Sequence, residues 1–437
     1  MPVPEIRPFR ALRYDLETAG ALSALVAPPY DVIGPALHDA LLARNPRNAV
    51  RLDLPAAVAG EDPDERFRRA ARTLQQWRTD GILRKDPRPS VYVHEQVYRV
   101  PGTALVRTQR GFFGRLRIEP FGPDAGVLPH ERTMTGPKEE RYRLLRATGV
   151  NTSPVIGLFS DRDGAAAAAM ARIAAGVPTA DVTDDDGVRH RLWAVPAGGD
   201  GTAEALAAVA GASPVVIADG HHRYETALRY RDERRVAHGG EVDPPYDFVL
   251  MLLLDAAGAL TVLPTHRLVR GLGELGLQQL QGGLETLFEV AATTPAELAA
   301  RFGAAGALAG GEGRFGLVTS GGAWLLQARR SAFAPLLAVG GEAVRSLDVS
   351  LLGAALDRLA GIDASAVAGG ERVAYTKSAD EALTAVVDAT ADAAFLLEPT
   401  PVASILAVAG DHDLMPQKST YFYPKALTGL LFNPHEQ

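Results

Sequence analysis

The sequence predicts an α/β protein with a mixed sheet, and three observations support this fold class. The apolar run at residues 214–218 is followed by Asp219, Gly220 and a long charged segment, as expected for a buried strand that turns into a helix. Residues 90–100 and 109–119 alternate between apolar and polar side chains, which indicates two strands. Residues 62–83 are amphipathic, with an acidic start and a glycine near the end, and predict a helix.

The length of 437 residues predicts two or three domains. We expect an N-terminal α/β part over residues 1–160, a central part over 161–270 and an Ala/Gly-rich α/β part over 271–437. The first part is expected to begin with an extended piece near 5–12 and a loop at 27–33 that leads into a helix from Pro35. The helix and the two strands named above follow. A polar loop at 130–136, a helix at 137–147 and a strand at 153–159 complete this part.

The central part is expected to begin with an Ala-rich helix, an acidic turn at 184–187 and a strand at 189–195. The strand-to-helix unit at 214–233 follows, and then a strand hairpin whose second arm ends at His266. The last part is expected to hold short helices, a strand pair at 313–328 and a terminal polar and aromatic cluster near 414–433.

The composition argues against several kinds of partner and site. The chain has 47% apolar and 22% charged residues and a net charge of −7, which fit a globular protein and argue against a nucleic-acid partner. No secretory signal or run of about 18 apolar residues is present, so we expect a cytoplasmic protein without a membrane partner. The sequence has no cysteine, so disulfides, thiolate metal sites and a cysteine nucleophile are excluded.

Lysine is rare in this chain. Only five of its 45 basic residues are lysines: Lys85, Lys138, Lys377, Lys418 and Lys425. Where a chain otherwise uses arginine, a lysine indicates a site that needs a compact point charge.

The stretch "PVVIADGHHRYETAL" contains the strongest candidate site. Gly220 permits a tight turn, and His221, His222 and Arg223 fall on the first turn of the predicted helix, where free N–H groups and the helix dipole favour an anion. Arginine binds phosphate through two hydrogen bonds, and histidine moves protons near neutral pH. The alternative is that Asp219 caps the helix and the histidines are incidental. A metal held by both histidines is disfavoured, because adjacent helical residues point about 100° apart.

The second candidate is "PHERTMTGPKEERY", where a cationic loop runs into a helix start and again suits an anionic group. Its residues are His130, Glu131, Arg132, Thr133 and Lys138. A solvated loop with a capping threonine is the alternative.

The third is "PQKSTYFYPK", with Lys418, Ser419 and Thr420. The glycines that a P-loop requires are missing upstream. The alternative is a C-terminal strand that packs Tyr421 and Tyr423 into the core.

Two further positions are weaker candidates. In "APPYDVI", Asp31 is either a general base or a helix cap. His266 is expected to be a hydrogen-bonded histidine of the core or its rim.

These motifs, with "IRPFRALRY", "VLPTHRLV" and "MPQKSTYFYPKALTGL", resemble a bacterial and archaeal family catalogued as a domain of unknown function, number one thousand and fifteen. The resemblance runs along the whole chain. It departs at residues 410–413, where a shorter Gly-Glu turn is expected, and this leaves open any role for an acid there. The motif "ADGHHRYETAL" is also similar to the ParB and sulfiredoxin superfamily, including its free-serine kinases, and so implies a ParB/sulfiredoxin-like core with helical and hairpin insertions.

The second resemblance implies a nucleotide-dependent phosphoryl transfer to or from a small hydroxy metabolite, with ATP or ADP as cofactor. The first resemblance suggests serine or phosphoserine as the metabolite. Because phosphoryl transfer needs charge neutralisation, we expect Mg²⁺ as the metal. Metal-assisted phosphatase activity and non-enzymatic nucleotide binding are the alternatives. The residues assigned are His221, His222 and Asp31 for catalysis; Asp219, Gly220, Arg223, Lys418, Ser419 and Thr420 for phosphate; and Tyr30, His130, Glu131, Arg132 and Lys138 for substrate.

Overall fold

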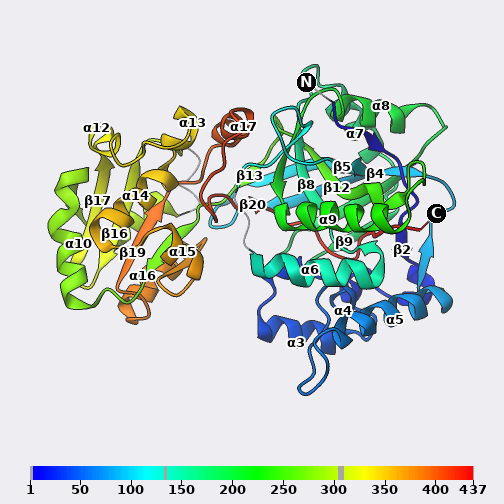
Figure 1. Ribbon diagram of the computed structural model, residues 1–437, viewed down its shortest axis with the longest axis horizontal. Coiled ribbons are helices and arrows are strands. Elements are labelled where there is room, and N and C mark those ends of the chain that lie inside the picture. Colours follow the sequence, from blue (N-terminus) through cyan, green and yellow to red (C-terminus); the bar gives the residue numbers. More distant parts are fainter. Residues whose placement is uncertain (1–2, 132–134, 304–309, 437) are drawn as a thin grey trace.

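A computed structural model describes residues 3–131, 135–303 and 310–436. It contains two large sheets, which lie side by side with their helices in Figure 1. The first sheet draws its strands from Ile6 to Asp255 and the second from His266 to Leu397. The prediction of an α/β protein with a mixed sheet is confirmed, because the first sheet contains both parallel and antiparallel strand pairs.

The first sheet has nine strands in the order β6-β11-β8-β12-β5-β4-β10-β9, with β1 also paired to β5. Among the described residues of this sheet, the pairs β11 with β6 and β12 with β8 are parallel and the other pairs are antiparallel. The strands are β1 (Ile6–Arg7), β4 (Ser90–Arg99), β5 (Val106–Arg117), β6 (Val127–Leu128), β8 (Val155–Phe159), β9 (Ala180–Thr183), β10 (Arg189–Pro196), β11 (Val215–Asp219) and β12 (Phe248–Asp255).

Strand β12 lies in the middle of this sheet and is buried on both faces. Val249, Met251 and Leu253 pack on one side, and alternate residues such as Leu250 and Leu252 pack on the other. The predicted hairpin of β12 with the following strand is wrong. Both edges of β12 are taken by β5 and β8, so β13 (Thr261–Val262) pairs instead with β20 (Phe422–Tyr423) near the end of the chain.

One face of the first sheet is covered by helices. Helix α9 (His221–Ala237) packs on β8 and β12, and α6 (Thr135–Thr148) packs on α9. Helix α5 (Glu65–Thr79) packs on α6, and Figure 1 shows α6 below α9 and α5 below α6. Helices α7 (Ala165–Ala174) and α8 (Thr202–Ala210) cover the part of the sheet around β1, β4 and β5.

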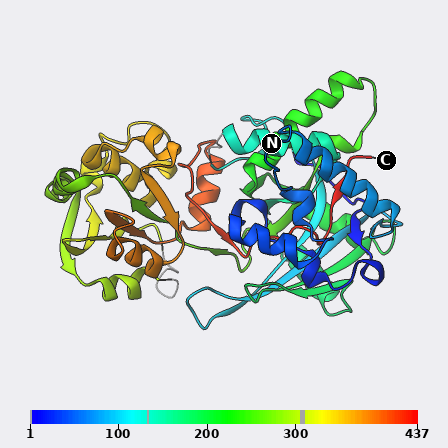
Figure 2. The same ribbon diagram turned by 90° about the horizontal axis from the view of Figure 1, so that it is seen from below.

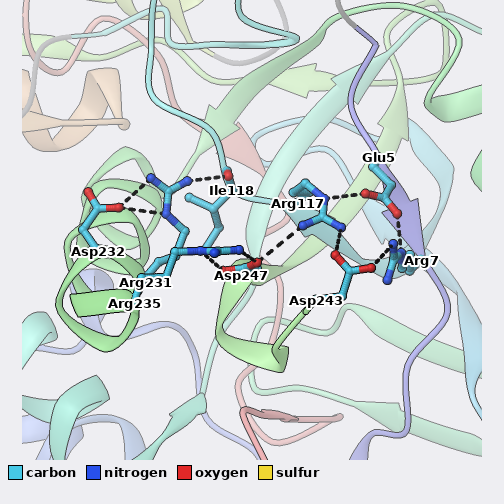
Figure 3. Close-up of polar contacts among 9 residues, drawn as sticks. All are labelled: Glu5, Arg7, Arg117, Ile118, Arg231, Asp232, Arg235, Asp243 and Asp247. Carbon is cyan, nitrogen blue, oxygen red and sulfur yellow. Dashed lines mark hydrogen bonds and ion pairs between the residues drawn. The ribbon is translucent and has the colours of Figure 1, made fainter. Parts of the chain in front are cut away.

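The C-terminal half of α9 is anchored by a chain of ion pairs, drawn in Figure 3. Asp247 is buried and accepts from Arg235 of α9 and, at 3.4 Å, from Arg117 at the end of β5. Arg117 continues the chain to Glu5 and Asp243, next to β1. The helix that carries the central motif is therefore fixed to the sheet at its far end.

The second sheet is antiparallel throughout, in the order β15-β17-β16-β19-β14-β18. The predicted strand pair at 313–328 is confirmed as β16 and β17. The strands are β14 (His266–Val269), β15 (Phe288–Thr293), β16 (Arg314–Thr319), β17 (Gly322–Ala328), β18 (Val373–Thr376) and β19 (Ala393–Leu397), and the longer helices around them are α10 (Gly273–Leu287), α11 (Pro295–Phe302), α14 (Asp348–Ala360), α16 (Ala379–Val387) and α17 (Val402–Gly410).

After the second sheet the chain returns to the first. The end of the chain passes through β20 and then pairs β21 (Asn433–Pro434) with β7 (Val150–Asn151). Figure 2 shows this red segment running from the second sheet back alongside the first. The remaining elements are β2 (Leu12–Tyr14), β3 (Leu83–Lys85), α1 (Leu16–Ala19), α2 (Leu22–Leu25), η1 (Tyr30–Val32), α3 (Pro35–Arg44), α4 (Val50–Asp53), η2 (Pro245–Asp247), α12 (Arg330–Phe333), α13 (Glu342–Arg345) and α15 (Ala364–Gly369).

Candidate functional site

The junction between β11 and α9 is a tight turn made by one glycine. Gly220 has φ 90° and ψ 29°, in the left-handed region that residues with a Cβ rarely adopt. A Cβ at this position would also lie 2.9 Å from Cζ of Arg223. The N–H groups of the first turn of α9 have no carbonyl partner within the helix, and the helix dipole adds positive charge there. The turn is therefore suited to hold an anion.

Asp219 holds two cations and does not cap the helix. Gly220 is the residue before α9 and has no side chain, so the capping alternative for Asp219 is wrong. Nζ of Lys425 lies 2.6 Å from one carboxylate oxygen of Asp219, and Arg223 donates to the other. Burial by itself would raise the pKa of the Asp219 carboxyl, but Lys425 and Arg223 outweigh burial and hold the pKa well below its ordinary value.

A cavity of about 520 Å³ opens at this turn and is lined by residues from both sheets. The first sheet and its neighbours contribute the start of α9 and η1, and the second sheet contributes the end of β18. The lining residues that matter below are Tyr30, Asp31, Glu131, Asp219, Gly220, His221, His222, Arg223, Thr265, Tyr375, Lys377, Lys418, Thr420, Tyr421 and Lys425. Asp31, the central motif and Lys418 are therefore brought together, although Asp31 and His221 are 190 positions apart in the sequence.

Three of the five lysines line this cavity. Nζ of Lys377 and Nζ of Lys425 lie 4.0 Å and 4.3 Å from the ring centre of Tyr421. Lys425 is neutralised by Asp219, whereas Lys377 and Lys418 have no carboxylate within 4.0 Å in the part of the chain that the structure describes. The cavity therefore contains two cations that a bound anion could pair with.

The two adjacent histidines have different surroundings. The ring of His221 packs edge-on against the ring of His130 at 4.7 Å, and its Nε2 accepts from the backbone N–H of His130 at 3.3 Å. His222 lines the cavity and is half-buried, and burial lowers its pKa. Burial also lowers the pKa of His221 well below its usual range. Both rings are therefore neutral near pH 7, and both residues line the cavity.

Glu131 carries a carboxyl group with an altered pKa. Burial raises its pKa to about 7, although its Oε1 accepts a hydrogen bond from the backbone N–H of Lys418 at 2.9 Å. This group changes its charge near neutral pH, at the wall of the cavity.

The other predicted residues lie at or behind the cavity wall. His130 is buried, and its ring bonds the carbonyl of Ile217 and, at 3.1 Å, the hydroxyl of Thr420. Ser419 is also buried, and its hydroxyl donates to the carbonyl of Pro416. Lys138 pairs with Glu225 and is not among the lining residues. Arg132 and Thr133 fall outside the described residues.

Tyr30 lines the cavity with Arg141 stacked 4.0 Å from its ring centre. Two nitrogens of Arg223 already have internal acceptors, the Pro154 carbonyl and Asp219.

Sequence reasoning missed Lys377, Tyr375 and the role of Lys425 as the partner of Asp219. Lys377 and Tyr375 belong to the Ala/Gly-rich part, where no local pattern marks a site. The rarity of lysine is the one signal that could have identified Lys377.

No group of three or more His, Asp or Glu residues arranged to hold a metal ion is found within residues 3–131, 135–303 and 310–436. Over the same residues, no helix combines the length and the apolar character needed to cross a bilayer.

A family model described as "Protein of unknown function (DUF1015)" matches residues 6–350. A search of proteins with curated descriptions finds no match. Among solved structures, a conserved hypothetical protein from Pyrococcus furiosus is 12% identical with a TM-score of 0.35, covering 71% of this chain and 90% of that one. A free serine kinase in complex with AMP is 13% identical with a TM-score of 0.37, covering 74% and 90%. A C-terminally truncated SbnI from Staphylococcus aureus is 10% identical with a TM-score of 0.36, covering 72% and 85%.

Proposed function

This chain belongs to the DUF1015 family, and we propose that its cavity binds the phosphates of a nucleotide and transfers a phosphoryl group between that nucleotide and a small hydroxy metabolite. One observation carries the proposal. The start of α9 and two lysines without a carboxylate partner in the described chain, Lys377 and Lys418, face the same cavity. Such a set of donors and charges is suited to an anion with several oxygens.

In this proposal the phosphates lie against the Gly220 turn. The first backbone N–H groups of α9 and the ring of His222 donate to phosphate oxygens, and Lys418 completes the set. The hydroxyl of Thr420 donates to Nε2 of His130 and so supports the wall beside them. Arg223 holds the turn from within, because its guanidinium is bonded to Asp219 and to the Pro154 carbonyl. His221 is fixed by His130 and shapes the wall behind the turn.

Asp31 is the proposed base, because it lines the cavity and is exposed. It accepts the proton of the metabolite hydroxyl, whose oxygen attacks the terminal phosphorus of the nucleotide. The bond from that phosphorus to the bridging oxygen breaks, and the shortened nucleotide leaves with the electron pair. Such chemistry depends on positioning and charge neutralisation more than on covalent steps, and the cavity supplies both.

The cavity fits a Mg²⁺ ion that arrives with the nucleotide better than one held by the protein alone. Three carboxylates line it in the described chain, and Asp219 is already paired with two cations. Glu131 already accepts from the backbone of Lys418, and Asp31 is assigned to the proton. The ion would therefore be held mainly by phosphate oxygens, as Mg²⁺ often is when it is bound with a nucleotide. When bound, the ion would neutralise phosphate charge.

Binding of ATP, ADP and CTP to the wild-type protein and to His222→Ala, Arg223→Ala and Lys418→Ala tests the phosphate role. Lys418→Ala removes one charge-assisted contact and should weaken binding about tenfold or more. Lys85→Ala is the matched control, because Lys85 does not line the cavity. Unchanged affinity in all three cavity variants would refute the phosphate site.

Phosphorus NMR with nucleotide, Mg²⁺ and a panel of hydroxy metabolites tests the reaction, with serine and phosphoserine first in the panel. A kinase produces a new phosphomonoester signal only when nucleotide and acceptor are both present. Release of inorganic phosphate without nucleotide would indicate a phosphatase. Saturable nucleotide binding without turnover over the panel would indicate a nucleotide-binding protein.

A further inference from the structure

Lys418 has an unusual backbone for a residue with a side chain. Its φ is 58°, in the left-handed region, while its side chain is exposed at the cavity. Residues other than glycine keep this conformation only when the surrounding structure holds it. Hydrogen bonds from neighbouring residues therefore have to hold Lys418 in this conformation.

Two side chains bond the backbone of Lys418 directly. Oε1 of Glu131 accepts from its N–H at 2.9 Å, and Nη2 of Arg267 donates to its carbonyl at 3.1 Å. Glu131 follows β6 of the first sheet, and Arg267 lies in β14 of the second. The backbone of Lys418 is thus bonded from both sheets at once.

The flanking residues are held in the same way. The N–H of Met415 donates to the carbonyl of His130 at 2.8 Å, next to Glu131. The hydroxyl of Thr400 donates to the carbonyl of Ser419 at 2.9 Å. This segment is therefore tied at several successive points, and Lys418 is the residue among them whose charged side chain reaches the cavity.

Arg267 is itself well fixed. Arg267 is buried, its other terminal nitrogen donates to the carbonyl of Thr265, and its guanidinium lies 5.1 Å from the ring centre of Tyr375. Burial lowers the pKa of Arg267 to about 10 and raises that of Glu131 to about 7, as expected for ionisable groups withdrawn from water.

We propose that Glu131 and Arg267 are positioning residues for Lys418, which fix the peptide groups on both sides of its Cα and so direct its ammonium group into the cavity. The expected effect of these two residues on phosphate affinity rests on the proposed function. Their hydrogen bonds to the backbone of Lys418 do not depend on it. Glu131 then acts through Lys418 and need not touch the ligand.

Hydrogen exchange of the Lys418 amide tests the hold on the backbone without any ligand. Glu131→Ala removes the acceptor and should speed exchange by about tenfold or more. Glu131→Gln keeps an oxygen in place and should restore slow exchange. Glu285→Ala, an exposed acidic residue of α10, is the matched control. Exchange unchanged in Glu131→Ala would overturn the proposal.

A double-mutant cycle with inorganic pyrophosphate as the probe tests the effect on the cavity. Glu131→Ala should weaken binding, Glu131→Gln should keep it, and Glu131→Ala in a Lys418→Ala background should cause no further loss. Arg267→Met should behave like Glu131→Ala, with Arg267→Lys as the variant that keeps a donor. Independent losses in the double variant would overturn the proposal, because Glu131 would then act without Lys418. If the wild type binds no pyrophosphate, the proposed function fails, and the exchange experiment alone decides the positioning role.

Discussion

The ion pair between Lys425 and Asp219 connects the last part of the chain to the central motif, and its removal gives the sharpest stability prediction. The two side chains are 11% and 17% exposed, with Nζ of Lys425 2.6 Å from the carboxylate. Removing one partner of a buried pair costs about 3–5 kcal/mol when the other is left unpaired. Because Arg223 still compensates Asp219, Lys425→Met should cost about 3 kcal/mol, at the lower end of that range.

Hydrogen exchange of the β11 amides measures this loss locally, as a smaller free energy of opening. The double variant Lys425→Met/Asp219→Asn should lose at least about 1 kcal/mol less than the sum of the single variants, because the two residues interact directly. Additive losses, or a loss below about 1 kcal/mol for Lys425→Met, would refute the reasoning.

The pair also has a pH signature. The pKa of Asp219 is lowered in the folded protein, so its stabilising contribution is present above the ordinary carboxyl pKa of 3.8 and is lost as the pH falls below it. Lys425→Met should raise the pKa of Asp219 and shrink that acid-dependent loss of β11 stability.

Three other predictions concern the Gly220 turn, the far end of α9 and the carboxyl group of Glu131. Gly220→Ala should cost about 2 kcal/mol by urea unfolding, since it adds left-handed strain and places a Cβ against Arg223, and a neutral result would mean that the turn relaxes freely. Asp247→Ala should cost about 1–2 kcal/mol, because the buried carboxylate is lost while Arg235 and Arg117, 48% and 30% exposed, can be hydrated; an unchanged exchange rate at the far end of α9 would contradict the anchoring role. The folded pKa of Glu131 is raised to about 7, so its stabilising contribution is fully present below the unfolded carboxyl pKa of 4.5 and falls as the pH rises through 7. Wild-type unfolding free energy should therefore fall relative to Glu131→Gln over that range, and parallel pH profiles would exclude the shift.

The strand-to-helix unit could be predicted because its signals are local. An apolar run, a glycine and a charged segment follow one another, and the structure places β11, Gly220 and α9 on them. The alternation of residues 90–119 likewise predicted β4 and β5. The pairing of β12 could not be predicted from its own residues, because its neighbours β5 and β8 are distant in the sequence.

The cavity was only partly predictable for the same reason. Its motifs were identified, but their meeting depends on the path of the chain from the second sheet back to the first. Thr420 lines the cavity, whereas Ser419 is buried behind it. The backbone at Lys418 is irregular, so no strand or helix periodicity in the sequence predicts which of the two side chains faces the cavity. The adjacent histidines have a local explanation, because successive residues on a helix point about 100° apart. Both residues line the cavity, and the ring of His221 also packs on His130.

The amide resonances of the Gly220 turn test the central claim most directly. If the turn holds the phosphates of a nucleotide, titration with ADP should shift the amide signals of Gly220, His221 and His222 and saturate, and Lys418→Ala should need more ADP for the same shift. Saturating binding of ADP that leaves these three amides unchanged, or no binding at all, would contradict the account.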